Sequence, residues 1–202
     1  MTGSVEKVVL ATNNPKKLVE LRRVIRDAGL EVEVLGLGDF DPYPEPAETE
    51  RTFEGNAFIK AEAATRHTGL PALADDSGLE VDELNSMPGV RSARWAGPEC
   101  NDAANNALLL AQLAGVPAER RGARFVCALA LALPGGGRQL WREEMPGRIA
   151  EEERGDGGFG YDPLFLPDGR ACTSAELTAT QKDAISHRGK AVRAFVAWLK
   201  EQ

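Results

Sequence analysis

The first 34 residues follow a strand, helix, strand order, and this order constrains the fold more than any other feature of the chain. Residues 7–11 are apolar enough for a buried strand, and residues 15–28 place apolar side chains on one helical face. Asn14 suits the N-cap of that helix and Pro15 its first position. Residues 32–34 then alternate as in a strand. This order is typical of an α/β fold.

The rest of the chain predicts a mixed central sheet flanked by helices. Helical patterns surround Phe53, Leu109 and Phe195, and residues 124–133 are strongly β-like and lead through a glycine turn to a second strand near Trp141, as in a hairpin. We expect one domain over residues 1–202, elongated and two-lobed, with the active-site cleft between the lobes.

Composition excludes several classes of partner. The chain has 24 basic and 31 acidic residues and a net charge of −7, so we expect no general binding to nucleic-acid backbones. No stretch is apolar enough for a signal peptide or a membrane span. The three cysteines are far apart and odd in number, which favours free thiols in a reducing cytoplasm.

Two adjacent carboxylates, Asp75 and Asp76, mark a predicted strand end before Ser77 and Gly78. Neighbouring residues on a strand point to opposite faces, so one Asp can hold a hard cation while the other binds local backbone. A solvated Asp-Ser-Gly turn is the alternative interpretation of these residues alone.

The junction at Thr12 and Asn13 predicts a phosphate site, because the N–H groups of a helix N-terminus bind anions. Lys16 and Lys17 add positive charge in a helical turn where lysine opposes the helix dipole. A well-capped helix with solvated lysines explains the same residues without a ligand.

Glu48 and Glu50 lie in an acidic loop, and either carboxylate can join Asp76 around Mg²⁺, which uses one or two carboxylates plus substrate phosphates. Most of this loop is expected to be solvated. Lys60 follows on the next helix, where its side chain either reaches the same carboxylates or extends into solvent.

Two later segments suit recognition of a nucleotide base. Phe159 and Tyr161 lie beside Asp162, and aromatic rings next to a carboxylate can stack on a base and accept its N–H groups. We expect one of the two rings to belong to the core. His187 and Arg188 open the last helix, where they can grip a purine edge or a phosphate.

Several short motifs occur in a fixed order along nearly the whole chain. They are Leu10-Ala11-Thr12-Asn13-Asn14 with Lys17, Thr52-Phe53 with Asn56-Ala57 and Lys60-Ala61, Ala74-Asp75-Asp76-Ser77-Gly78-Leu79, Pro88-Gly89-Val90, Ser92-Ala93-Arg94, Gly157 to Pro163, Ala175-Glu176-Leu177, Lys182 and Ile185 to Gly189. In this order they closely resemble the inosine triphosphate pyrophosphatase family, also called XTP/dITP diphosphatases.

The resemblance implies a homodimeric, Mg²⁺-dependent enzyme that cleaves dITP, ITP and XTP between the α- and β-phosphates. Asp76 would be the proton acceptor and a metal ligand, with Glu48 as the second ligand, although the choice between Glu48 and Glu50 stays open. Substrate would be held by Thr12, Asn13, Asn14, Pro15, Lys16, Lys17, Lys60, Ser77, Phe159, Gly160, Tyr161, Asp162, Lys182, His187 and Arg188.

Two alternatives remain at this point. A related pyrophosphatase with another nucleotide preference, such as 7-methyl-GTP or modified pyrimidines, would use a similar set of residues. A non-catalytic nucleotide sensor would bind the same ligands, but it would be free to lose Asp76 or Lys17, which this chain keeps.

Overall fold

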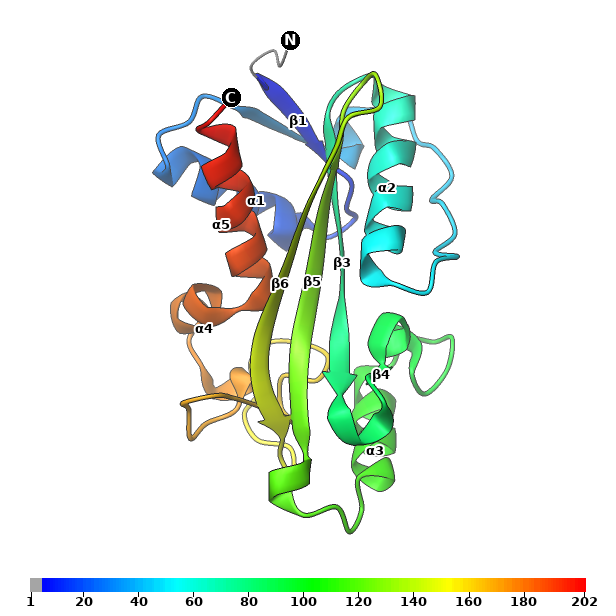
Figure 1. Ribbon diagram of the computed structural model, residues 1–202, viewed down its shortest axis with the longest axis vertical. Helices are drawn as coiled ribbons and strands as arrows, with labels where there is room; N and C mark the ends of the chain where they lie inside the picture. The colour runs from blue at the N-terminus through cyan, green and yellow to red at the C-terminus, as the bar shows by residue number, and fades with distance from the viewer. Residues whose placement is uncertain (1–4) are drawn as a thin grey trace. The chain divides into compact units, whose positions relative to one another are not determined.

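The computed structural model describes residues 5–202, which form an α/β fold around one mixed sheet (Figure 1). Its strand order is β2-β1-β3-β5-β6-β7, and β4 pairs with β3. Strand β1 is parallel to β2 and β3, whereas β4 is antiparallel to β3 and β7 is antiparallel to β6. The strands are β1 (Lys7–Leu10), β2 (Glu33–Gly36), β3 (Ala72–Val81), β4 (Met87–Pro88), β5 (Gly122–Ala132), β6 (Arg138–Ile149) and β7 (Phe165–Pro167).

The helices agree with the sequence patterns, with one addition. They are α1 (Pro15–Asp27), α2 (Phe53–Thr68), α3 (Asp102–Gln112), α4 (Ala179–Ile185) and α5 (His187–Leu199). The short helix α4 was not predicted. It begins with a capping box, in which the Thr178 hydroxyl accepts from the Gln181 N–H and the Gln181 side chain accepts from the Thr178 N–H.

The chain divides into two compact units. Unit 1 comprises the described residues up to Asp76 together with Cys127–Arg142 and Lys190–Gln202, and unit 2 comprises Ser77–Val126 and Glu143–Gly189. The boundaries fall inside β3, β5, β6 and α5, so no separate linker joins the units.

The core of unit 1 follows from the alternation of side chains along β1. Val8 packs in a cluster that includes Leu21 of α1 and Phe195 of α5. Val9, which points the other way, packs against Ala64 of α2. Helices α1 and α5 therefore cover one face of the unit 1 sheet and α2 covers the other (Figure 1).

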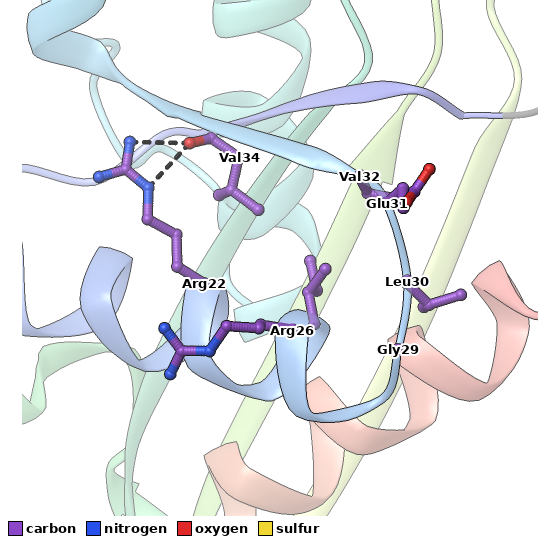
Figure 2. A pocket seen from close by; sticks show the side chains of 8 residues that line it. Arg22, Arg26, Gly29, Leu30, Glu31, Val32 and Val34 are labelled. Carbon is purple, nitrogen blue, oxygen red and sulfur yellow. Dashed lines mark hydrogen bonds between the residues drawn. The ribbon is translucent and has the colours of Figure 1, made fainter.

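Arg22 of α1 stabilises the turn that leads from α1 to β2. The guanidinium of Arg22 donates two hydrogen bonds, of 2.9 and 2.8 Å, to the Val34 carbonyl (Figure 2). Gly29 ends the helix with a φ of +71°, which glycine adopts without strain. Figure 2 shows the hollow that this turn encloses, and its lining contains none of the predicted site residues.

The core of unit 2 lies between α3 and the sheet. Leu109 of α3 packs in a cluster with Leu79 of β3, and Phe125 of β5 lies 4.6 Å from Phe165 of β7 between ring centroids. The buried guanidinium of Arg121 donates to three main-chain carbonyls, of Leu113, Val116 and Ala150. Leu113 is the C-cap of α3 and Val116 follows it, so Arg121 ties the segment after α3 to Ala150.

Strand β3 is longer than the sequence predicted. It continues through Asp75 and Asp76 to Val81, so the predicted strand end and the Asp-Ser-Gly turn are wrong. Beyond this point β3 stays in the sheet, where it lies next to β5 and pairs with β4 at Glu80 and Val81. Among residues 5–202, no helix is long and apolar enough to cross a membrane, and no cysteine forms a disulfide.

Candidate functional site

The predicted phosphate site lies in unit 1, where β1 leads into α1. Asn14 caps the helix by accepting from the Lys16 N–H at 3.0 Å, and the Thr12 hydroxyl accepts from the Asn14 N–H at 3.2 Å. The ammonium of Lys17 lies 2.7 Å from Asp75, whose side chain is only 3% exposed. Lys17 is therefore not a freely solvated lysine, and Asp75 has an ionic partner 58 residues away that the sequence did not predict.

A second charged cluster in unit 1 joins the acidic loop to α2 and β3. The Lys60 ammonium donates to Glu48 Oε1 at 3.1 Å and to Asp76 Oδ1 at 3.0 Å. Asn56 donates to the other Asp76 oxygen at 3.3 Å and accepts from the Glu50 N–H at 3.0 Å. The Lys60 side chain therefore reaches the carboxylates. Glu48 and Asp76 share the Lys60 ammonium as a partner, whereas Glu50 takes part through its main-chain N–H, which donates to Asn56.

Burial and charge oppose each other within this cluster. Burial raises the pKa of the Asp76 carboxyl, and the Lys60 ammonium offsets only part of that rise. Burial by itself lowers the pKa of Lys60, but the attraction of Asp76, followed by that of Glu48, leaves this pKa above its ordinary value. Asp76 is thus a more basic carboxylate than an exposed aspartate, which suits a proton acceptor.

The chemistry of the same cluster fits a magnesium ion. Residues 5–202 contain no group of three or more His, Cys, Asp or Glu side chains that would form a protein-only metal cage. Mg²⁺ does not need such a cage, because it binds through one or two carboxylates plus substrate phosphates and water. Glu48 and Asp76 already contact one common cation, the Lys60 ammonium.

A pocket of about 340 Å³ adjoins these residues within unit 1. Its lining includes Thr12, Asn13 and Lys60, and most of the remaining lining residues come from the loop segment 37–46. The exposed His67 of α2 supports this loop, since its ring stacks on Tyr43 at 4.6 Å and its Nε2 lies 2.8 Å from the Asp41 carbonyl. No pattern in the sequence indicated this contact between α2 and the loop.

In unit 2, the two predicted aromatic residues have different environments. The ring of Phe159 is 73% exposed, and the Lys182 ammonium lies 4.9 Å from its centroid. Tyr161 is only 4% exposed and donates its hydroxyl to the Ser92 carbonyl at 2.8 Å. Burial raises the pKa of Tyr161, and the Asp102 carboxylate adds to the rise. As expected, one ring belongs to the core, and the available platform is Phe159.

The glycine loop before Phe159 is shaped by Asp162. The Asp162 carboxylate is buried, forms an ion pair with Lys182 and accepts from the Phe159 N–H at 2.8 Å. Gly158 has a φ of +78°, and a Cβ at this position would collide with that carboxylate. The loop therefore requires glycine there because of both its backbone conformation and the close approach of Asp162.

Helix α5 begins at His187, as predicted. The His187 ring stacks on Phe125, with centroids 5.1 Å apart and an interplanar angle of 11°. The Ser186 hydroxyl accepts from the Gly189 N–H at 3.0 Å and so caps the first turn. His187 and Arg188 are both half-buried, as is Ser77, the first residue of unit 2 on β3.

One residue of the unit 1 cluster was missed as a site residue although the sequence carried a signal for it. Asn56 lies on α2 four positions before Lys60, and side chains at this spacing share a helix face. Asn56 also follows Phe53 by three positions, on the buried face of α2. A polar amide on a buried face next to a lysine indicates a partner, which the structure identifies as Asp76.

Comparison with known proteins gives relatives of nearly equal length. Residues 8–198 match the Ham1 family. A dITP/XTP pyrophosphatase of Nocardia farcinica is 59% identical over 188 residues, which cover 93% of this chain and 91% of the relative. A dITP/XTP pyrophosphatase of Mycobacterium tuberculosis is 56% identical over 197 residues, which cover 97% of this chain and 96% of the relative.

Solved structures agree with this relationship. The nucleoside-triphosphatase / dITP/XTP pyrophosphatase of Mycobacterium abscessus is 53% identical, with a TM-score of 0.82 over 94% of this chain and 97% of that one. A HAM1 protein from Coxiella burnetii is 41% identical, with a TM-score of 0.91 over 97% of this chain and 99% of that one. Sequence and fold match over almost the whole length, and the chain therefore belongs to the Ham1 family.

Proposed function

We propose that this protein hydrolyses dITP, ITP and XTP to the nucleoside monophosphate and pyrophosphate, and so removes these purine nucleotides from the cellular pool. The observation that carries the proposal is the cluster of Glu48, Lys60 and Asp76, in which a buried carboxylate of raised pKa shares a cation with a second carboxylate. The names of its close relatives, dITP/XTP pyrophosphatases, support the substrate class.

Within unit 1, the triphosphate would bind at the start of α1. The helix N-terminus, Asn13 and Lys17 supply N–H groups and positive charge for the phosphate oxygens. Asp76 and Glu48 would hold Mg²⁺, which polarises the α-phosphate and stabilises a pyrophosphate leaving group when it is bound. The Asp76 carboxylate would take the proton of the attacking water.

Within unit 2, the purine would stack on the exposed ring of Phe159, with Gly160 and Tyr161 completing the loop. Lys182, His187 and Arg188 offer hydrogen-bond donors for a 6-oxo group. Arg has donors and no acceptor, so it suits the carbonyl of hypoxanthine or xanthine and cannot pair with the amino group of adenine. An unpaired buried donor costs about 1–3 kcal/mol, so two mismatches discriminate by a few orders of magnitude.

The protein is further proposed to be a homodimer of the cytoplasm that binds neither membranes nor nucleic acid. The net charge of −7 supports the last point, since nucleic-acid affinity comes mainly from neutralised phosphates. Sedimentation equilibrium of the purified chain measures the mass of the assembly, and a monomer at micromolar concentration would contradict the dimer.

Product analysis tests the proposed reaction. ITP is incubated with enzyme and Mg²⁺, nucleotides are separated by chromatography, and orthophosphate is assayed before and after added inorganic pyrophosphatase. We expect IMP, with orthophosphate released only after that addition. IDP with stoichiometric orthophosphate would overturn the cleavage position. Equal hydrolysis of ATP or GTP would overturn the substrate class, and binding without turnover would indicate a sensor.

A further inference from the structure

Gly160, which follows the exposed Phe159 ring, is held by two side chains of α3. Its N–H donates to Asp102 Oδ2 at 2.7 Å, and its carbonyl accepts from Asn106 Nδ2 at 3.2 Å. Asp102 and Asn106 are four positions apart, so they share one helix face. All four residues belong to unit 2.

Gly160 has no side chain that could anchor the backbone at this point of the loop. Gly160 has a φ of +59°, and a Cβ built there would meet no atom of the described residues within 4 Å. A glycine in open space has a wide choice of conformations. The two hydrogen bonds from α3 therefore act together with those that join Phe159 to Asp162 in fixing the direction of the chain as it leaves Phe159.

The side chain of Asn106 is not the one that would stabilise the fold most at this buried position. Its side chain is 3% exposed, and its Oδ1 has no hydrogen-bond partner among residues 5–202. A buried acceptor without a partner lowers stability, and a leucine of similar shape would avoid this cost. Among the described residues, the hydrogen bond that this amide forms is the one from its Nδ2 to the Gly160 carbonyl.

We propose that Asp102 and Asn106 are positioning residues for purine recognition, which act by holding Gly160 and thereby the ring of Phe159. This inference rests on the proposed stacking of the purine on Phe159. It predicts that loss of the Asp102 or the Asn106 side chain weakens the binding of nucleotides. The binding of ligands that consist of phosphate alone should be unchanged.

The test uses Asn106→Leu and Asp102→Ala with two ligands, ITP and inorganic tripolyphosphate as a competitive inhibitor without a base. Loss of one hydrogen bond is expected to raise the KM for ITP about three- to tenfold with kcat nearly unchanged. The inhibition constant of tripolyphosphate should stay constant. Asn106→Leu should also keep or raise Tm, and Asp102→Asn, which retains the acceptor oxygen, should restore a KM close to wild type.

Asn105→Leu is the matched control. Asn105 is as buried as Asn106, but its amide binds the Ala96 N–H and the Ala93 carbonyl instead of Gly160. We expect this variant to lower Tm and to leave the KM for ITP unchanged.

The variant Phe159→Ala distinguishes two possible errors: a wrong positioning role for Asp102 and Asn106, and a wrong proposal that the purine stacks on Phe159. If Phe159→Ala leaves the KM for ITP unchanged, the proposed purine contact is wrong. If Phe159→Ala raises KM but Asn106→Leu and Asp102→Ala do not, the positioning role is overturned. Parallel rises in KM for ITP and in the inhibition constant of tripolyphosphate would also overturn it, since they would indicate a general structural defect.

Discussion

The proposed phosphate and metal residues of unit 1 are charged and already paired, whereas the main contact surface of unit 2 is an exposed ring. Lys17 is bound to the buried Asp75, and Lys60 is bound to Glu48 and Asp76. Phe159 is 73% exposed and is placed by hydrogen bonds to the loop around it. Substitution of these paired residues of unit 1 should therefore change charge balance and activity together, while substitution of Phe159 in unit 2 should change binding alone.

The largest effect is expected at Asp76, where activity and stability should separate. Removal of a general base typically costs about 10²- to 10⁴-fold in rate, so kcat of Asp76→Asn should fall by that range. Between the ordinary pKa of 3.8 and its raised value, the folded protein binds more protons than the unfolded chain, so the free energy of unfolding falls as pH rises. The charged Asp76 thus opposes folding at pH 7, whereas its attraction raises the pKa of Lys60 and favours folding. Because these two effects oppose each other and Glu48 remains beside Lys60, Asp76→Asn should change Tm little.

Initial rates at saturating Mg²⁺ and thermal unfolding at pH 7 check this prediction. Asp27→Asn, at the exposed end of α1, is the control for loss of an aspartate charge. Unchanged turnover of Asp76→Asn would reject the assigned role, and a large loss of Tm would show that the pair with Lys60 stabilises the fold.

Lys17→Ala should reduce both phosphate binding and stability. An unpaired charge would be left on the buried Asp75, and breaking a buried ion pair costs about 3–5 kcal/mol. This reverses the expectation for a solvated lysine, whose removal from a first helical turn would slightly stabilise the protein. We expect a raised KM for ITP and a lower Tm.

The double variant Lys17→Met with Asp75→Asn separates the two effects, because it removes both charges. Its Tm should recover while its KM stays high. Lys16→Ala, in the same helical turn but exposed, serves as a control for stability and should keep or slightly raise Tm. Recovery of both Tm and KM in the double variant would show that Lys17 serves the fold and not the phosphates.

Phe159→Ala should show the opposite behaviour, with weaker binding and intact stability. Stacking of a base on an aromatic ring contributes about 1–3 kcal/mol, so the KM for ITP should rise by about 5- to 150-fold. Tm should hardly change, because most of the ring is in solvent. Val19→Ala removes another exposed apolar side chain, from α1, and should change neither quantity. A fall in Tm without a change in KM would contradict this contrast.

The smallest effect is expected at His67, which supports the loop that carries Glu48. Loss of an aromatic pair costs about 0.5–1.5 kcal/mol, so the Mg²⁺ concentration for half-maximal activity should rise a few-fold in His67→Ala. The kcat at saturating Mg²⁺ should be unchanged. Tyr43→Ala removes the same stack from the other side and should act alike. An unaltered Mg²⁺ dependence in both variants would show that the loop holds Glu48 without them.

Local patterns predicted much of the fold. The cap at Asn14, the helix over residues 53–68 and the glycine turn after β5 all depend on residues close in sequence. The motif order identified the family, and the contact of Lys60 with Asp76 was among the stated options.

What the sequence did not predict depends on contacts between distant segments. Strand β3 stays extended through Ser77 and Gly78, against the turn preference of these residues, because it pairs with distant strands of the sheet, β5 and β4. The partner of Asp75 is far away in the chain, on α1. The support of Gly160 by α3 likewise joins residues that no spacing rule relates.

The division of unit 1 into three separated segments has a consequence for synthesis on the ribosome. Residues of α5, including Val192 and Phe195, complete the core in which Val8 and Leu10 of β1 are buried. Chains are made from the N-terminus, so the charged residues of unit 1 are translated long before the helix that covers their sheet. A nascent chain that stops short of α5 contains every proposed catalytic side chain but lacks the packing that holds them in place. Such a chain would expose the apolar face of the unit 1 sheet that α5 normally covers, and cellular quality control recognises exposed apolar surface of this kind.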